Sequence, residues 1–221
     1  GKLIFLKKLY LNDNQLTGSI PKSFGDLVAL ENMSLKNNML SGVIPAEIEN
    51  LKLLSRFIIS NNDISGTIPT QIGEMSSLSV LMIENNQIYG TIPDEIENLG
   101  LLVDVRMEQN RLSGDLPDGL WTLDQLDDLY LDGNLFTGTI STKIAGLTKI
   151  GYLYLNDNKF DGTVPTEIAT LQSLVSLTLH DNDIKGAIPD ALCDSSVLEH
   201  LSADCTAQKL YVECSCCVNC Q

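Results

Sequence analysis

The chain has 221 residues, of which 29 are acidic and 14 are basic, and its formal net charge is −15 at pH 7. This charge argues against nucleic acid or an anionic membrane as a partner, because both carry the same sign and would repel the protein. The sequence holds no run of about 18 apolar residues and therefore predicts no membrane insertion in this segment.

Residues 1–5 come before a regular pattern begins. Leu3 stands at the last apolar place of a preceding unit, and the chain starts at Gly1 without Met. We therefore expect residues 1–5 to be the end of a preceding repeat or a truncated N-terminal cap.

From residue 6 to residue 197 the chain repeats a 24-residue unit eight times. Such a period predicts a stack of coils in which each unit buries its apolar side against its neighbours, so we expect one elongated domain. The units open with Leu6, Leu30, Leu54, Leu78, Leu102, Leu126, Ile150 and Leu174.

The first half of the unit predicts a short strand. In the first unit Leu9 and Leu11 are two residues apart, which places both side chains on the inner face. Each unit then carries an asparagine whose amide, when buried, has enough donors and acceptors to join adjacent coils in a ladder. These ladder asparagines are Asn14, Asn38, Asn62, Asn86, Asn110, Asn134, Asn158 and Asn182.

The second half of the unit predicts a turn and a short helix on the opposite side. A glycine recurs four residues after the ladder asparagine, from Gly18 to Gly186, and indicates either a bend or a close approach of the backbone. Phe24 and Leu27 are three residues apart, which suits a 3₁₀ or helical turn. The prolines stand just before that turn, where their preset φ and missing donor fit. They are Pro21, Pro45, Pro69, Pro93, Pro117, Pro165 and Pro189.

The segments LSGVIP, ISGTIP, IYGTIP and LSGDLP are copies of one motif. On these motifs, residues 6–197 resemble the plant-type subclass of leucine-rich repeat proteins. The resemblance implies an α/β solenoid: a right-handed superhelix with a parallel sheet on its concave face, a shorter second strand, and 3₁₀ or short helical segments on its convex side. It also implies an extracellular recognition module, either a receptor-like ectodomain or a secreted binder of a peptide, protein or cell-wall glycan, in some cases with a co-receptor.

Two alternative functions stay open. The subclass also resembles secreted inhibitors of wall-degrading enzymes, of the polygalacturonase-inhibiting type. A structural, adhesive, ice-binding or polysaccharide-binding solenoid would instead use the rows of hydroxyl side chains beside the glycine, although Ser and Thr suit a short strand in any case. These rows are Thr17, Ser41, Ser65, Ser113 and Thr137 on one side and Ser19, Thr67, Thr91, Thr139 and Thr163 on the other.

Two units depart from the pattern. In the sixth unit Ser141 replaces the proline, and Gly133 stands where other units carry Asn, Asp or Gln; in the fifth, Trp121 lies on the convex turn. We interpret these residues as tolerated variation with Trp121 as a packing anchor. The alternative is a binding site on the convex side.

The residues two, four and six places after each opening leucine should point outward from the concave sheet. They vary from unit to unit and are therefore free to specify a partner. Tyrosine and arginine on a rigid sheet are favoured interface anchors, and the middle and late units gather them among acidic residues. The alternative is a merely solvated face. The predicted ligand site is Arg106, Tyr130, Tyr152, Tyr154, Asp104, Asp128, Asp132, Glu84 and Glu108.

Candidate catalytic and metal-binding groups are few. His180 and His200 lie in adjacent units near Asp181 and Asp204, and a weak divalent-metal site is the alternative to ordinary surface residues. No set of nucleophile, base and acid recurs, and no glycine-rich phosphate loop is present. We predict no enzymatic activity, no catalytic residue, no cofactor and no metal.

The C-terminal residues 198–221 should form a final degenerate repeat and a disulfide-rich cap. A cap too small to hold a core of its own would use disulfides, and these indicate an extracellular protein. The alternative is a thiolate zinc or copper site. The tail also resembles caps in repeat proteins of diatoms and related algae. All the cysteines lie near this end, and their pairing stays open: Cys193, Cys205, Cys214, Cys216, Cys217 and Cys220.

Asn32 begins the sequence Asn-Met-Ser, which is a glycosylation sequon on the predicted concave strand. Glycosylation there would support secretion and would shield the early part of the concave face. Asn32 is therefore predicted as a modification site.

Overall fold

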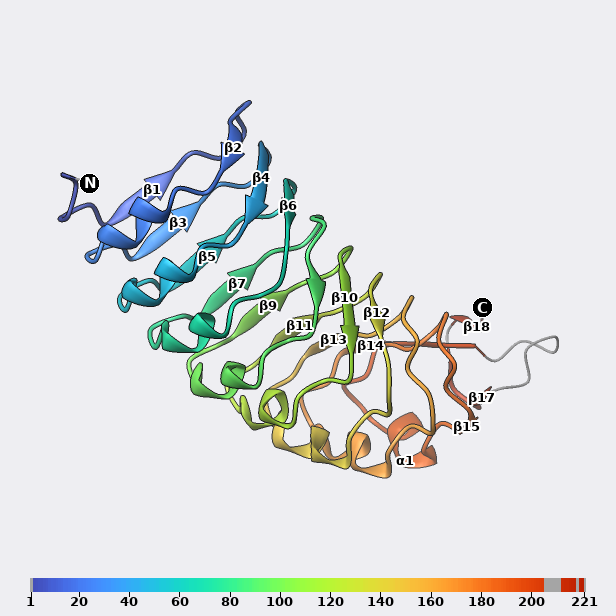
Figure 1. Cartoon of the computed structure of the whole chain (residues 1–221). Coiled ribbons are helices and arrows are strands. Elements are labelled where there is room, and N and C mark those ends of the chain that lie inside the picture. Colours follow the sequence, from blue (N-terminus) through green and yellow to red (C-terminus); the bar gives the residue numbers. More distant parts are fainter. Residues whose placement is uncertain (1, 205–211, 218, 221) are drawn as a thin grey trace.

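In the computed structural model, which describes residues 2–204, 212–217 and 219–220, the chain winds into a curved stack of coils (Figure 1). The coils contribute short strands to a ten-stranded sheet whose neighbours all pair in parallel. The α/β solenoid implied by the resemblance is confirmed. In order across the sheet, the strands are β1 (Lys8–Tyr10), β3 (Asn32–Ser34), β5 (Arg56–Ile58), β7 (Val80–Met82), β9 (Asp104–Arg106), β11 (Asp128–Tyr130), β13 (Tyr152–Tyr154), β14 (Ser176–Thr178), β16 (His200–Ala203) and β18 (Asn219–Cys220).

The register of the large sheet equals the period of the sequence. Lys8 pairs with Asn32, Asn32 with Arg56, and the same step of 24 residues continues to His200. Equal steps place residues from the same position of each unit in straight rows across the sheet. The alternate residues of the strands, such as Met33 and Phe57, are buried in the core.

Short strands also form beside the recurrent glycine, where they make three small parallel sheets. The glycine has φ between +69° and +86°, so the bend is real. A Cβ at Gly42 would also lie 3.0 Å from Cβ of Ser19, so both interpretations of the glycine apply. The strands are β2 (Thr17–Ser19), β4 (Met39–Val43) and β6 (Asp63–Ser65), then β8 (Tyr89–Gly90), β10 (Arg111–Gly114) and β12 (Leu135–Phe136), then β15 (Gly186–Ala187) and β17 (Val212–Glu213).

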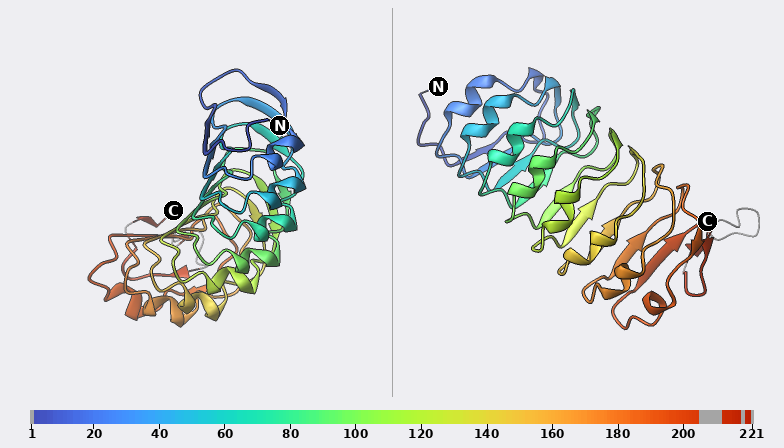
Figure 2. Two further views of the ribbon diagram at one scale, coloured as in Figure 1. Left: turned by 90° about the vertical axis from the view of Figure 1, so that its left-hand side faces the viewer. Right: turned by 60° about the horizontal axis from the view of Figure 1, so that its bottom comes forward.

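The convex side carries a column of short helices (Figure 2). Among the described residues, six 3₁₀ helices follow a proline whose φ lies between −72° and −67°. In the sixth unit Ser141 has φ −68°, and its hydroxyl accepts a hydrogen bond of 3.2 Å from the amide of Lys143, which explains the departure from proline. The helices are η1 (Lys22–Asp26), η2 (Ala46–Asn50), η3 (Thr70–Glu74), η4 (Asp94–Asn98), η5 (Asp118–Thr122), η6 (Thr142–Gly146) and η7 (Thr166–Thr170), followed by the α-helix α1 (Asp190–Cys193).

The predicted asparagine ladder joins each coil to the one before it. The amide of Asn38 donates to the carbonyls of Leu11 and Leu35 at 2.9 and 3.0 Å, and its oxygen accepts from the amide of Leu16 at 2.9 Å. The same pattern recurs at Asn62, Asn86, Asn110, Asn134 and Asn158.

The residue before each ladder asparagine adopts a left-handed conformation, which the sequence analysis did not predict. Seven of these residues are Asp, Asn or Gln with φ between +53° and +58°, and the eighth is Gly133 with φ +63°. Asn and Asp tolerate this conformation better than other side chains, and glycine tolerates it best. Gly133 therefore meets the same requirement for a positive φ that Asp, Asn or Gln meets in the other units.

Apolar side chains form one continuous core along the stack, from Ile20 to Val212. Trp121 belongs to this core and is 2% exposed, so the interpretation of this residue as a packing anchor is confirmed. Among the described residues, every helix is too short or too polar to cross a bilayer.

Two disulfides close the C-terminal end of the stack. Cys193 in α1 bonds to Cys216, and Cys214 bonds to Cys217. Disulfides are thereby confirmed in preference to a thiolate metal site for these four cysteines. Cys205 and the side chain of Cys220 lie outside the described residues.

Candidate functional site

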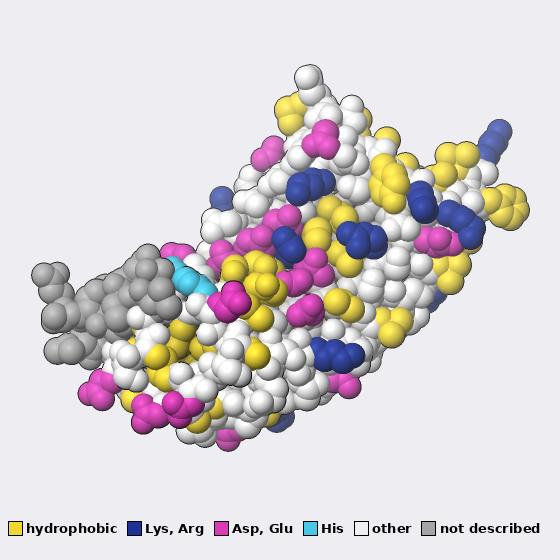
Figure 3. All heavy atoms as spheres, turned by 180° about the vertical axis from the view of Figure 1, so that it is seen from behind, with side chains coloured by type: hydrophobic (Ala, Val, Ile, Leu, Met, Phe, Trp, Pro, Cys, Tyr) yellow, Lys and Arg dark blue, Asp and Glu magenta, His cyan; other side chains and the backbone are white. Residues whose placement is uncertain are grey.

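The outward-facing residues of the large sheet form two straight rows on the hollowed face shown in Figure 3. Acidic, basic and hydrophobic side chains meet near the middle of this face, as the sequence predicted. The first row is Lys8, Asn32, Arg56, Val80, Asp104, Asp128, Tyr152, Ser176 and His200. The second row is Tyr10, Ser34, Ile58, Met82, Arg106, Tyr130, Tyr154, Thr178 and Ser202.

Arg106, Tyr130 and Tyr154 form a contiguous group on β9, β11 and β13, which we call the aromatic cluster. The rings of Tyr130 and Tyr154 meet edge to face, with centroids 4.6 Å apart and an interplanar angle of 75°. The guanidinium carbon of Arg106 lies 4.8 Å from the centroid of Tyr130, within cation–π range. Straight pairing of adjacent strands is what brings these three side chains together.

Acidic residues of the first row hold the aromatic cluster in place. Nε of Arg106 donates to Oδ1 of Asp104 at 3.0 Å, and this pair is partly exposed, so its main role is to fix the guanidinium over the ring. Burial and the nearby carboxylates of Asp104 and Asp127 raise the pKa of Asp128. Burial, followed by the charge of Asp128, raises the pKa of Tyr130 to about 12. The phenol of Tyr130 therefore stays protonated at neutral pH, and its hydroxyl donates a hydrogen bond to the carboxylate of Asp128.

Tyr152 adds a third ring beside the aromatic cluster. It pairs with Asp128 across β11 and β13 and is 38% exposed. On the far side, the Ser176 hydroxyl donates to the Tyr154 hydroxyl oxygen at 3.4 Å. The structure thus places six of the nine predicted site residues next to one another: Asp104, Arg106, Asp128, Tyr130, Tyr152 and Tyr154.

Glu84, Glu108 and Asp132 form a separate group, which we call the acidic row, just beyond the ends of β7, β9 and β11. Glu84 is only 6% exposed. Oε2 of Glu84 and Oε2 of Glu108 are buried and have no hydrogen-bond partner among the described residues. Buried carboxylate oxygens without partners are costly, and among the described residues Glu84 and Glu108 share this property only with Oδ1 of Asp204.

The electrostatics of the acidic row reflect burial and mutual repulsion. Burial raises the pKa of Glu108 to about 7, and the carboxylates of Glu84 and Asp132 add to the shift. Burial likewise raises the pKa of Asp132. A cationic group placed against this row would relieve both effects, because it would supply a charge partner to carboxylates that already lack water.

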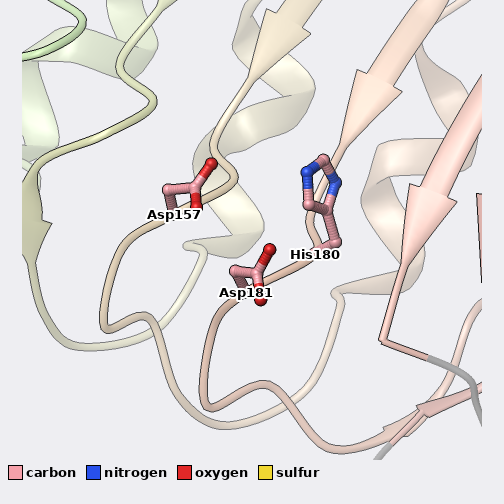
Figure 4. A group of neighbouring side chains, drawn as sticks. All are labelled: Asp157, His180 and Asp181. Carbon is pink, nitrogen blue, oxygen red and sulfur yellow. The ribbon is translucent and has the colours of Figure 1, made fainter. Parts of the chain in front are cut away.

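Asp157, His180 and Asp181 also lie together (Figure 4); the sequence analysis grouped His180 with Asp181 but did not include Asp157. One potential ligand atom of each lies within 4.8 Å of the others. The proposed partner of His180, His200, instead sits in the first row of the sheet opposite Ser176. His180 and His200 are therefore in adjacent coils but at different places along them, which corrects the predicted grouping.

Asp204, the other residue of that predicted metal grouping, has a structural contact. One of its carboxylate oxygens, Oδ2, accepts a hydrogen bond of 3.2 Å from the amide of Asn182. Asp204 therefore takes part in joining the last coils rather than in a site with His180.

Two further predicted features are placed by the structure without being tested. Asn32 lies in β3 between Lys8 and Arg56 and is partly exposed, so its glycosylation stays a prediction. In the hydroxyl rows, Ser41 and Ser65 donate to backbone carbonyls of the preceding coil at 3.5 and 3.2 Å. These hydroxyls therefore have structural contacts within the solenoid.

Comparison with known proteins agrees with this architecture. Family models described as leucine rich repeat match residues 5–64, and also residues 77–99 and 173–195. No match was found among curated protein sequences.

Solved structures of plant receptors superpose closely on the chain. A plant peptide hormone receptor, RGFR1 in complex with RGF2, is 31% identical with a TM-score of 0.87 over 95% of this chain and 32% of its own. The ectodomain of the Arabidopsis thaliana receptor kinase GASSHO1/SCHENGEN3, in complex with CASPARIAN STRIP INTEGRITY FACTOR 2, is 32% identical with a TM-score of 0.85 over 90% and 24% of the two chains.

A third similar structure contains three proteins. The Arabidopsis receptor kinase HAESA, in complex with the peptide hormone IDA and the co-receptor SERK1, is 30% identical with a TM-score of 0.76 over 97% of this chain and 39% of its own. The present chain thus spans between 24% and 39% of the length of these three structures.

Proposed function

The chain belongs to the leucine-rich repeat family, and from this premise we propose that it is an extracellular recognition module that binds a peptide or protein segment through its concave face. The observation that carries the proposal is the aromatic cluster of Arg106, Tyr130 and Tyr154. Its side chains are already ordered by contacts with one another and with Asp104, so a ligand need not pay the entropy of arranging them.

The composition of the surface favours a ligand with basic and apolar side chains. Tyr130 and Tyr154 offer aromatic area together with hydroxyl groups, which is the usual make-up of an interface anchor. Asp104, Asp128 and the acidic row surround them with negative charge, and this charge would attract a cationic ligand and speed its association. A lysine or arginine of the ligand would lie beside the acidic row, where its charge would act on the carboxylates of Glu84 and Glu108, whose Oε2 atoms are themselves buried.

The packing of the tyrosines favours a peptide over a glycan. A sugar ring stacks on an open aromatic face, but Arg106 lies over the ring of Tyr130, and the rings of Tyr130 and Tyr154 pack against each other edge to face. Peptide side chains and backbone groups can instead use the ring edges, the phenol hydroxyls and the carboxylates. We therefore narrow the three ligand classes left open by the sequence to a peptide or protein segment.

The similar structures support this function by analogy. RGFR1 is a peptide hormone receptor in complex with RGF2, and HAESA is a receptor kinase in complex with the peptide hormone IDA and the co-receptor SERK1. By analogy, a co-receptor is the second partner we propose for this chain. The two disulfides fit an extracellular location, because such bonds persist in oxidising compartments.

A selection from a displayed library of random peptides tests the proposal directly. The immobilised chain is the bait, and the enriched peptides are then titrated against wild type, a Tyr130→Ala/Tyr154→Ala variant and a Tyr10→Ala control. Tyr10 lies in the same row but in β1, and it is 59% exposed. We expect peptides rich in Lys, Arg and apolar residues, with affinity reduced by about 30-fold or more in the double variant and unchanged in the control.

Two results would contradict the proposal. One is a set of peptides that bind the double variant as tightly as wild type. The other is an affinity that falls equally in Tyr10→Ala, because this would place the binding surface away from the aromatic cluster. Thermal unfolding of each variant shows whether the fold is intact before binding is compared.

A further inference from the structure

Asp157, His180 and Asp181 converge on one point beside the large sheet. Asp157 follows β13, whereas His180 and Asp181 follow β14 in the next coil. Asp157 and Asp181 occupy the same place in their units and share the left-handed backbone conformation, each with φ +53°. The two aspartates are therefore held at equivalent turns of adjacent coils, with the imidazole near both (Figure 4).

A buried serine orients the imidazole. Nδ1 of His180 is hydrogen-bonded to the hydroxyl of Ser202, which is only 1% exposed in β16. In the tautomer with the proton on Nδ1, the ring donates to this hydroxyl and keeps the lone pair on Nε2. The second ring nitrogen faces the carboxylate of Asp157 in Figure 4. This is the arrangement by which a second contact fixes a metal-binding histidine.

The surroundings of the group are acidic. Asn156 donates to Oδ2 of Asp157 at 2.6 Å, which holds that carboxylate while Oδ1 has no such contact from Asn156. No ion pair of Asp157 with a Lys or Arg occurs among the described residues. Asp132 is near enough for the charges of Asp157 and His180 to act on its carboxyl group. A cation would thus enter a region of net negative charge.

We propose that Asp157, His180 and Asp181 form a binding site for a late first-row divalent cation, of which Zn²⁺ is the representative. One imidazole with two carboxylates suits Zn²⁺, Ni²⁺ or Cu²⁺, whereas Ca²⁺ and Mg²⁺ prefer oxygen ligands alone. Three protein ligands leave a coordination position open, which is typical of sites that bind a further molecule rather than of closed structural sites.

The ligand atoms need a small adjustment to bind a metal. They lie within 4.8 Å of one another, whereas tetrahedral Zn²⁺ with bonds of about 2.0–2.2 Å needs ligand atoms about 3.3–3.6 Å apart. Asp157 and Asp181 are exposed, and exchange of the Asn156 contact of Asp157 for the metal would let the carboxylates close this gap while Ser202 keeps the imidazole in place. The site is independent of the proposed ligand-binding function, and either can fail without the other.

Calorimetric titration with Zn²⁺ at neutral pH, without reductant, tests the site. We expect one bound ion per chain and a dissociation constant raised at least about tenfold in His180→Gln, because the nitrogen ligand is lost. His200→Gln changes the only other histidine of the chain and should leave binding within about twofold. Ser202→Ala should weaken binding by about tenfold, since it removes the contact that orients the ring.

A second measurement avoids variants altogether. Because the chain has only two histidines, paramagnetic Ni²⁺ should broaden the imidazole NMR signals of His180 more strongly than those of His200. Equal broadening of both, equal Zn²⁺ affinity in His180→Gln and wild type, or the same response to Ca²⁺ as to Zn²⁺ would overturn the proposal. So would the absence of Zn²⁺ binding up to about 1 mM, the weak end of the specific range.

Discussion

The asparagine ladder and the acidic row are both polar groups set into the same stack, but they differ in how their atoms are satisfied. The amide of Asn62 donates to three carbonyls at 3.0–3.1 Å and its oxygen accepts from the amide of Leu40 at 2.9 Å. Glu84, with a similar exposure of 6%, has an Oε2 with no partner among the described residues. The amide nitrogen and oxygen of Asn62 both have hydrogen-bond partners within the chain, whereas Oε2 of Glu84 has none among the described residues.

This difference shows that the repeat satisfies the polar residues that recur in every unit but not all of those that vary between units. A residue that recurs in every unit can be satisfied by its neighbours, because the neighbouring coils offer the same backbone groups each time. A residue found in only some of the units has no such partner built in, and Glu84 and Glu108 each keep a buried carboxylate oxygen without a partner among the described residues. The following predictions test whether the ladder stabilises the fold while the acidic row costs stability.

The largest effect is expected for Asn62→Ala. The substitution removes four hydrogen bonds and leaves the amide of Leu40 buried without its partner, so we expect a loss of about 3 kcal/mol in the free energy of unfolding. Urea unfolding followed by circular dichroism measures it. Asn98→Ala, at the exposed end of η4, is the matched control and should change stability by less than about 0.5 kcal/mol. Equal losses in both variants would show that the ladder is not special.

An intermediate effect is expected for Glu108→Gln, and it should depend on pH. Burial raises the pKa of Glu108 from the ordinary 4.5 to about 7, so between these values the folded chain holds more protons than the unfolded chain. Its contribution to the free energy of unfolding therefore falls as pH rises through this window. After allowance for solvent screening, the free energy of unfolding should decline by about 1–2 kcal/mol less in Glu108→Gln than in wild type as the pH rises through this window.

Unfolding titrations at pH 4.5, 6 and 7.5 check this prediction. Glu49→Gln removes the same charge from the exposed convex side and serves as the control. Asp128 and Asp132 also have raised pKa values, so some decline with pH should persist in the variant. A decline identical in Glu108→Gln and wild type would show that the acidic row does not cost stability at neutral pH.

The smallest effect concerns the left-handed turns. Asn85 is exposed and has φ +54°. Asn85→Val should destabilise the chain by about 1 kcal/mol, because a β-branched side chain clashes in this conformation, whereas Asn85→Gly should be close to neutral. Thermal unfolding of the pair gives the comparison. If valine and glycine have the same effect, the backbone conformation is not what selects the residue type at this position.

The sequence allowed the rows of the concave face to be predicted residue by residue. A constant period of 24 means that the register is set once for the whole sheet, so Arg106, Tyr130 and Tyr154 had to be neighbours on adjacent strands. The inward leucines and the ladder asparagines follow from the same periodicity. The assignment of the aromatic cluster and the acidic row as a ligand site stays a prediction until binding is measured.

Other features were beyond the reach of periodicity. The left-handed residue varies among Asp, Asn, Gln and Gly, and only its backbone angle reveals what these types share. The burial of Glu84 depends on how its neighbours pack, and the distance between Asp157 and His180 depends on how their side chains are oriented. Cysteine pairing depends on the path of the chain after the last repeat, where the period has ended.

The fixed spacing of the parallel strands also determines which conformation of a ligand that runs along the stack can place its side chains in step with the coils. Adjacent coils repeat about every 4.8 Å, whereas the same face of an extended β-strand repeats about every 6.8 Å, so a ligand in that form falls out of step with the rows. A polyproline II helix presents the same face every third residue, about 9.3 Å apart, which nearly equals two coils. The rows are therefore commensurate with a left-handed ligand helix, whose every third side chain would meet every second coil.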